Sequence, residues 1–302
     1  MDLMAEFKKT VEVLRSNLIL FLPALIIFYL IPVALLIAAV YIFTPIIIVA
    51  LKSPSFPSTL IQGSLLGFTV IIVLAVLSYI YVLSGAANMN KRAVLTGTSS
   101  MNDFWEGCRK YFGKLLAGVI LLAIVYGIII VAGSILTIAL ILPEIPKIPA
   151  PEVMPEVPTK VFGPEAFSGL APWLIEILKI LSGALGIWLV LLTVSGLIFI
   201  FTLFWVQTLV VDDVGVFKAI GTSIKFVRRN LKTTFGVVSL WIIAQGFARA
   251  IFPGGGMGGG GPGYGWGFGF PPPLQAVFQL LIATFFTLLL YVVYMDRTGK
   301  MP

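Results

Sequence analysis

Long apolar stretches constrain the fold of this chain more than any other feature of its sequence. A helix needs about 20 apolar residues to cross the hydrocarbon layer of a bilayer, which is roughly 30 Å thick. Backbone polar groups cannot bind water inside that layer, so each such stretch is expected to be helical. The expected spans are residues 18–43, 60–87, 115–142, 184–211, 233–252 and 274–295.

The composition agrees with a membrane protein and excludes several kinds of chemistry. The chain is 59% hydrophobic and only 11% charged, far from the usual composition of a soluble domain. It has no His and a single Cys, Cys108, which excludes His-based catalysis, Cys/His metal sites and an intrachain disulfide. We therefore predict an all-α, polytopic helical protein that forms a single transmembrane domain over residues 1–302, with no cofactor, metal or catalytic residue.

The distribution of Lys and Arg predicts the orientation, because loops near spans carry most of these residues on the cytoplasmic side. Residues 1–17, 88–114 and 212–232 and the tail after residue 295 hold most of the 20 Lys and Arg residues. Both termini are therefore predicted to be cytoplasmic, in the plasma membrane. Residues 1–17 mix acids with bases and no small-residue cleavage site follows, so an uncleaved first span is expected.

Three segments carry apolar residues at helical spacing just before a span. Steps of four, three and four residues put these side chains on one face of a helix. The residues are Phe7, Val11, Leu14 and Leu18, then Phe104, Cys108, Tyr111 and Leu115, then Ile220, Ile224, Val227 and Leu231. Basic residues lie between them, so we predict three amphipathic helices on the cytoplasmic membrane surface. One helix and two spans would form a unit, and we predict a threefold pseudo-repeat of helical hairpins; a six-span bundle without internal symmetry is the alternative.

The basic residues of these helices are the candidate docking site for lipid headgroups or a partner. Each is worth on the order of 1 kcal/mol against an anionic leaflet, although these residues also set the topology without binding any ligand. The expected partners are membrane lipids with anionic headgroups, while a protein partner or homo-oligomer stays open and nucleic acid is not expected. The candidates are Lys8, Lys9, Arg15, Arg109, Lys110, Lys114, Lys225, Arg228, Arg229 and Lys232.

Acidic residues near the second and third basic helices are interpreted as helix caps. Asp212 and Asp213 have no third metal ligand nearby, so we predict that they cap the third helix, because a carboxylate accepts from free N–H groups of a first turn. Ser100 and Asp103 have the spacing of a capping box before the second helix.

Residues outside the six spans include two low-complexity outer loops, Pro-rich residues 143–172 and Gly-rich residues 253–273. The apolar stretch from 171 to 211 is too long for one crossing. We expect its first part, 171–183, to be an interfacial helix that leads into the fourth span, with one long helix as the alternative.

The stretch Val210–Ser223, followed by Arg228-Arg229-Asn230, resembles a signature of prokaryotic membrane proteins. The resemblance, specific over residues 205–240, is to the six-span membrane domain associated with glycerophosphodiester phosphodiesterases. It implies a polytopic module with an amphipathic helix after the fourth span. It does not imply the phosphodiesterase activity, which in fused relatives belongs to a separate soluble barrel.

The functional interpretation is a non-enzymatic membrane scaffold or lipid-organising module. The spans hold no ionisable residue at mid-depth, which argues against a pump or a proton-coupled carrier. A channel or permease for a small neutral or lipid-like substrate is the first alternative. A membrane-bound enzyme is the second, and it would have to use Asp212 with Arg228 and Arg229.

Overall fold

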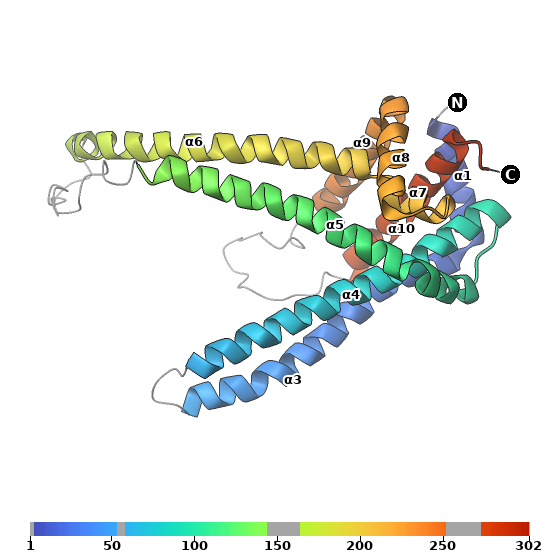
Figure 1. The fold of residues 1–302 in the computed structure, drawn as a ribbon, viewed down its shortest axis with the longest axis horizontal. Helices are drawn as coiled ribbons and strands as arrows, with labels where there is room; N and C mark the ends of the chain where they lie inside the picture. Colours follow the sequence, from blue (N-terminus) through green and yellow to red (C-terminus); the bar gives the residue numbers. More distant parts are fainter. Residues whose placement is uncertain (1–2, 53–57, 144–163, 252–272, 302) are drawn as a thin grey trace. The chain divides into compact units, whose positions relative to one another are not determined.

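The computed structural model describes residues 3–52, 58–143, 164–251 and 273–301, and all regular structure in these ranges is helical (Figure 1). Within these ranges, six helical segments are long and apolar enough to cross a membrane. They are Leu18–Pro45, Gln62–Thr96, Met101–Ile141, Ile180–Val211, Leu231–Ala248 and Gln275–Arg297. The chain is thus an all-α protein with six candidate membrane spans, and each predicted span overlaps one of these segments.

The first basic helix and first span are a series of helical segments of different kinds rather than one continuous α-helix. The series is α1 (Leu3–Ser16), a 3₁₀ turn (Leu18–Leu20), α2 (Phe21–Leu25), a π-helical turn (Ile26–Leu30) and α3 (Ile31–Lys52). Pro23 and Pro32 lack the N–H that a regular helix needs and their rings crowd the preceding turn. The wider π turn between them fits this local disruption.

Seven more helices follow along the described residues. They are α4 (Ser58–Thr96), α5 (Met101–Ile141), α6 (Pro164–Thr202), α7 (Trp205–Val211), α8 (Val216–Arg229), α9 (Leu231–Ile251) and α10 (Pro273–Arg297). Residues 171–183 form no separate helix, since α6 runs unbroken through them. The expectation of a distinct interfacial helix was wrong, because the apolar, helix-favouring sequence continues through Gly183 without a stop signal. Residues 164–172, predicted as loop, are the first turns of α6, while the rest of the outer loops lies almost wholly outside the described residues.

The chain divides into two compact units. Unit 1 comprises Met1–Gly118 and Thr202–Pro302, and unit 2 comprises Val119–Phe201. In unit 2, α5 and α6 approach each other where Gly133 faces Leu191 and Gly183 faces Leu140. Tyr126 also donates a hydrogen bond to the Ser195 carbonyl oxygen at 3.4 Å. Helices α5 and α6 both continue from one unit into the other, so the prediction of a single transmembrane domain stays a prediction.

Helix α10 is the centre of unit 1. Its last turns are almost fully buried from Leu288 to Met295, and it contacts α1, α2, α4, α7 and α9. A second close contact lies where α4 crosses α5, with Gly85 and Gly107 facing each other's helix. Small residues let helix backbones approach closely in this way. The packing of α1 and α7 against α10, and the crossing of α4 and α5, thus hold the segments that carry the basic residues in place.

Candidate functional site

Helix α8 has three distinct faces, one of them buried and two exposed. Ala219, Ser223, Phe226 and Val227 are buried, and the Phe226 ring lies 5.1 Å from that of Tyr294 on α10. Ser223 accepts a hydrogen bond from the backbone N–H of Phe204 at 3.2 Å. Helix packing inside a membrane protein favours such small and weakly polar residues, because lipid competes well for large apolar ones.

The other two faces of α8 are exposed. One is an apolar edge formed by Phe217, Ile224 and Leu231, with Phe217 80% exposed. Beside it lies a basic face with Lys225, Arg228, Arg229 and, at the start of α9, Lys232, all exposed. At 100° per residue, the apolar edge and the basic face are neighbours around the helix. An exposed apolar strip beside a row of cations is the arrangement of a helix that lies in a membrane interface.

Helix α1 repeats this division into faces, 213 positions earlier in the chain. Its buried residues are Glu6, Thr10, Val13 and Asn17, at the positions of Ala219, Ser223, Phe226 and Asn230. Its exposed apolar edge is formed by Met4 and Val11 and continues in Leu18 after the helix, at the positions of Phe217, Ile224 and Leu231. Arg15 then occupies the position of Arg228, with Lys8 also exposed. The first and third basic helices are thus structurally equivalent.

The two helices also end in the same way. The side-chain amide of Asn17 donates to the carbonyl oxygen of Val13 at 3.0 Å, and that of Asn230 donates to Phe226 at 3.0 Å. In both cases the Asn satisfies a carbonyl that the end of the helix leaves free, four residues earlier. Asn17 donates to Gly97 as well, which ties the end of α1 to the connection between α4 and α5.

The second basic helix, at the start of α5, has a different register from the one its apolar pattern predicts. Phe104, Cys108, Tyr111 and Leu115 are all buried, whereas the residues aligned with them in the other two helices are mostly exposed. When the helices are aligned by their buried residues, Phe104 corresponds to Glu6 and not to Phe7. The predicted equivalence of the three apolar stripes was therefore wrong by one residue in the second copy, because the stripe there packs against protein.

The Asp212-Asp213 pair lies in the junction between α7 and α8, which we define as Val210–Gly215. Neither residue caps α8, so that prediction was wrong: Gly215 occupies the N-cap position, without any side-chain hydrogen bond. Asp212 is instead the C-cap residue of α7, and Asp213 has a positive φ of 50°. Asp is one of the few side chains that tolerate this left-handed conformation.

Ion pairs hold both carboxylates of this junction. Asp213 binds Lys110 at 2.9 Å and Lys114 at 2.8 Å, both on α5. Asp212 accepts a hydrogen bond from the Tyr294 hydroxyl at 3.0 Å and pairs with Lys300. The Asp212 carboxylate thus contacts α10 and the C-terminal tail, and these contacts give no support to the enzyme candidate that combined Asp212 with Arg228 and Arg229.

Two donors bind the backbone of the same junction. Lys91 on α4 donates to the carbonyl oxygens of Val210 at 2.8 Å and Val211 at 3.3 Å. The hydroxyl of Tyr111 on α5 also donates to Val210 at 3.3 Å. A cation such as the Lys91 ammonium is stabilised at the C-terminal end of a helix, where free carbonyl groups point outward. Sequence reasoning missed Lys91 because its partners are more than 100 residues away.

The capping box before α5 is confirmed. The Asp103 carboxylate accepts from the backbone N–H of Ser100 at 2.8 Å, and the Asp103 N–H donates to the Ser100 hydroxyl at 3.4 Å. Arg92 lies 3.8 Å from Asp103 and also 3.8 Å from Glu106. Among the described residues, no three Asp, Glu, Cys or His side chains form a group that could hold a metal ion.

The basic candidates thus fall into groups with different surroundings. Lys110 and Lys114 are paired with Asp213, and Lys9 donates to the sulfur of Met301 at 2.7 Å. The others have no ion-pair partner in the ranges that the structure describes. They are Lys8, Arg15, Arg109, Lys225, Arg228, Arg229 and Lys232, and all seven are exposed.

Replacing Asp213 with Asn should lower the stability of unit 1 in a pH-dependent way. The hydrogen bonds from Lys114 and Lys110 lower the pKa of Asp213 to about 2. A lowered pKa means that the stabilisation is present above the ordinary value of 3.8 and is lost as the pH falls toward 2. Because the carboxylate is half exposed, the effect at pH 7 should be about 1 kcal/mol or less. Asn keeps the tolerance for positive φ.

The measurement is thermal unfolding of the purified protein in detergent at pH 7 and again near pH 2. The difference between wild type and Asp213→Asn should shrink at the lower pH and also in high salt. A difference that stays constant across this pH range would show that the two lysines do not stabilise the junction through the Asp213 charge.

Comparison with known proteins gives one family match. A family model described as a domain of unknown function (DUF7847) matches residues 1–295. No curated protein and no solved structure gives a significant match. The family description names no activity and no phosphodiesterase, so the resemblance over residues 205–240 stays a prediction.

Proposed function

The chain belongs to the DUF7847 family of domains of unknown function, and we propose that it is a non-enzymatic membrane module that organises anionic lipids. In this proposal α8 and α1 are amphipathic helices at the cytoplasmic surface of the plasma membrane. Both termini then face the cytoplasm. Their basic faces bind headgroups while their apolar edges insert between acyl chains.

The observation that carries the proposal is the exposed apolar edge beside the exposed basic face of α8. Large apolar residues such as Phe217, at 80% exposure, are costly in water and favourable in the interfacial layer. The neighbouring cations Arg228 and Arg229 would then lie at headgroup depth, where each contributes on the order of 1 kcal/mol. The equivalent faces of α1 provide a second copy of the same arrangement.

The scaffold part of the proposal is supported by how firmly these helices are held. The buried face of α8 packs on α10 through Phe226 and Tyr294, and α1 packs on α10 through Phe7 and Phe285, whose rings are 4.8 Å apart. A rigidly held basic face loses little conformational entropy when it binds a headgroup. Arranged in this way, the protein would gather anionic lipids around itself or present them to a protein partner or a second copy.

The proposal predicts that removing three charges from the α8 basic face lowers lipid retention. The variant is Arg228→Gln, Arg229→Gln and Lys232→Gln in one chain. The probe is native mass spectrometry of the protein purified from mixed phosphatidylglycerol and phosphatidylcholine. Three charges at about 1 kcal/mol each correspond to a loss of bound phosphatidylglycerol of about a hundredfold.

A charge-matched control separates this effect from a change in overall charge. Lys52 follows the first predicted span, and Lys147 and Lys160 follow the third, so we expect all three on the side opposite the basic helices. Their replacement by Gln removes the same charge. This control should retain phosphatidylglycerol as the wild type does. Equal retention by wild type and the α8 variant would contradict the proposal, as would retention of phosphatidylcholine and phosphatidylglycerol in equal amounts.

A further inference from the structure

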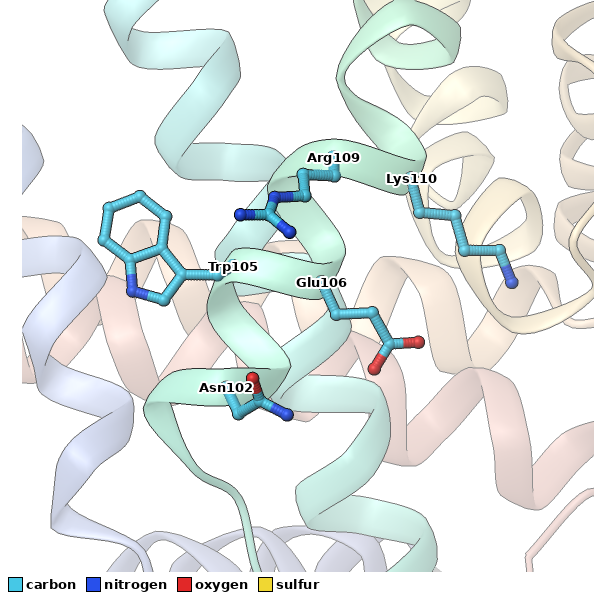
Figure 2. Close-up of a pocket in the computed structure, with 5 residues that line it drawn as sticks. All are labelled: Asn102, Trp105, Glu106, Arg109 and Lys110. Carbon is cyan, nitrogen blue, oxygen red and sulfur yellow. The ribbon is translucent and has the colours of Figure 1, made fainter.

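A groove of about 530 Å³ lies along the first turns of α5 (Figure 2). It is lined by Asn102, Trp105, Glu106, Arg109 and Lys110. Figure 2 shows Trp105 on one side, Glu106 and Lys110 on the other, and the guanidinium of Arg109 directed to the Trp105 side. The groove thus has an aromatic wall, a charged wall and one arginine between them.

The position of Arg109 is unlike that of the other basic candidates. When the basic helices are aligned by their buried faces, Arg109 corresponds to Val11 of α1 and Ile224 of α8. Those two residues belong to the exposed apolar edges, whereas most basic residues of α1 and α8 lie on the basic faces. On α5, Arg109 therefore puts a cation at the position where α1 and α8 have an apolar side chain that would face lipid.

Aromatic rings surround this edge on α4 and α5. The Trp105 ring is 6.5 Å from that of Tyr81 and 5.2 Å from that of Phe104, and Tyr81 is 5.7 Å from Phe112. Trp105 is 48% exposed and Tyr81 37% exposed, so the ring cluster is open on its outer side. Trp and Tyr prefer the headgroup level of a bilayer. The ring cluster thus indicates that Arg109 lies at that depth.

Arg109 has no ion pair and no side-chain hydrogen bond to any other residue in the described ranges. Lys110, its neighbour, is held 2.9 Å from Asp213, and Glu106 lies 3.8 Å from Arg92. Placing an arginine at the edge of the hydrocarbon layer costs free energy unless an anion pairs with it. Its planar guanidinium matches the oxygen atoms of a phosphate in a two-point contact.

We propose that this groove binds the phosphodiester group of one membrane phospholipid, with Arg109 as its anchor. Trp105 and Tyr81 pack against the glycerol and the first methylene groups. Glu106 and Asn102 accept hydrogen bonds from donors on the headgroup, such as the ammonium of ethanolamine or the hydroxyls of glycerol. The inference deepens the proposed function, on which it rests, because it names one specific lipid site beside the diffuse binding by α8.

The carboxylate of Glu106 adds selectivity. A negative charge in the groove disfavours ligands with two charges, such as inorganic phosphate or a phosphate monoester. It favours a singly charged diester whose headgroup can donate hydrogen bonds. Phosphatidylethanolamine and phosphatidylglycerol fit this description, whereas phosphatidylcholine has no N–H or O–H group to donate.

The experiment compares Arg109→Gln with the wild type in native mass spectrometry. Full-length protein is equilibrated with equal amounts of phosphatidylethanolamine, phosphatidylglycerol and phosphatidylcholine. The wild type should keep one phosphatidylethanolamine or phosphatidylglycerol after mild activation, and Arg109→Gln should lower that occupancy about tenfold, the ratio that corresponds to about 1.4 kcal/mol. Arg109→Lys, which keeps the charge without the two-point contact, should fall between them.

The control is Lys218→Gln, which removes one exposed charge from α8, away from the groove. It should keep the single bound lipid, and thermal unfolding should show that Arg109→Gln is folded. Unchanged occupancy in Arg109→Gln would overturn the site. So would displacement of the lipid by inorganic phosphate, or retention of a stoichiometric protein in place of any lipid.

The same measurements distinguish this site from the proposed function. If the triple variant of α8 loses lipid while Arg109→Gln does not, the groove fails and lipid organisation stands. If Arg109→Gln alone loses its single lipid, the groove stands and the wider lipid-organising function fails.

Discussion

Replacing Gly107 with Ala is expected to lower the unfolding temperature of the protein sharply. A Cβ atom at Gly107 would lie 2.5 Å from Cβ of Asn88 and 2.7 Å from the carbonyl oxygen of Ser84, both on α4. The Ser84 oxygen belongs to the helix backbone and cannot rotate away. The helices would have to separate, and overpacking of this kind costs about 1–3 kcal/mol or more.

The matched control is Gly113→Ala, six residues further along the same helix. No atom lies within 4 Å of a Cβ built at Gly113, and Ala favours a helix over Gly by about 1 kcal/mol. The control should therefore be as stable as the wild type or slightly more so. Thermal unfolding in detergent, followed by circular dichroism, measures both. Equal unfolding temperatures for the two variants would show that α4 and α5 do not cross closely at Gly107.

Replacing Arg297 with Leu is expected to destabilise the contact between α1 and α10 by about 3 kcal/mol at neutral pH. The Nε atom of Arg297 lies 2.8 Å from Oε1 of Glu6, whose side chain is only 4% exposed. The second oxygen of Glu6 has no hydrogen-bond partner among the described residues. Without Arg297, a buried carboxylate would lose the cation that compensates for its burial.

The pH dependence of that variant gives the sharper test. Burial raises the pKa of Glu6 above its ordinary value of 4.5, and the Arg297 charge lowers it again in part. For an acid whose pKa is raised in the folded state, ionisation lowers the free energy of unfolding. This loss is absent at pH values below the ordinary pKa and grows as the pH rises through the folded-state pKa. The deficit of Arg297→Leu should therefore be large at pH 8 and small near pH 4.

A second variant shows whether the Glu6 charge is the cause. In the combined variant Glu6→Gln and Arg297→Leu, the buried group is neutral at every pH, so the pH-dependent part of the deficit should disappear. Unfolding temperatures of wild type and both variants between pH 4 and pH 8 give the comparison. A deficit independent of pH in Arg297→Leu would contradict a charged Glu6 as the source of the instability.

The basic helices show why sequence periodicity predicted a helix but not its orientation. The predicted apolar stripe of α8 has the spacing of a packed face, and yet the structure exposes Ile224 and Leu231. It buries Ala219 and Ser223 beside Phe226 and Val227. In a soluble protein the larger apolar residues would be buried. In a membrane protein they lose little by facing lipid, so close packing selects the small residues.

The Asp212-Asp213 pair shows a second limit. Two acids before a helix satisfy the sequence rule for a cap, but Gly215 takes the cap position. The carboxylates bind Lys110, Lys114 and Lys300, which are 88 to 103 positions away in the sequence. By contrast, the Ser100–Asp103 cap is a contact over three residues, and sequence spacing was enough to predict it.

Sequence alone determined the helical class, the six candidate spans and the segments that carry the basic residues, because each depends on length, hydropathy or spacing within one segment. Tertiary structure decided which face of each helix is buried, that α1 and α8 are equivalent while α5 is shifted by one residue, and which cations are paired. Those properties depend on contacts between distant segments. Arg109 became distinctive only when the buried face of α5 fixed the direction of its side chain.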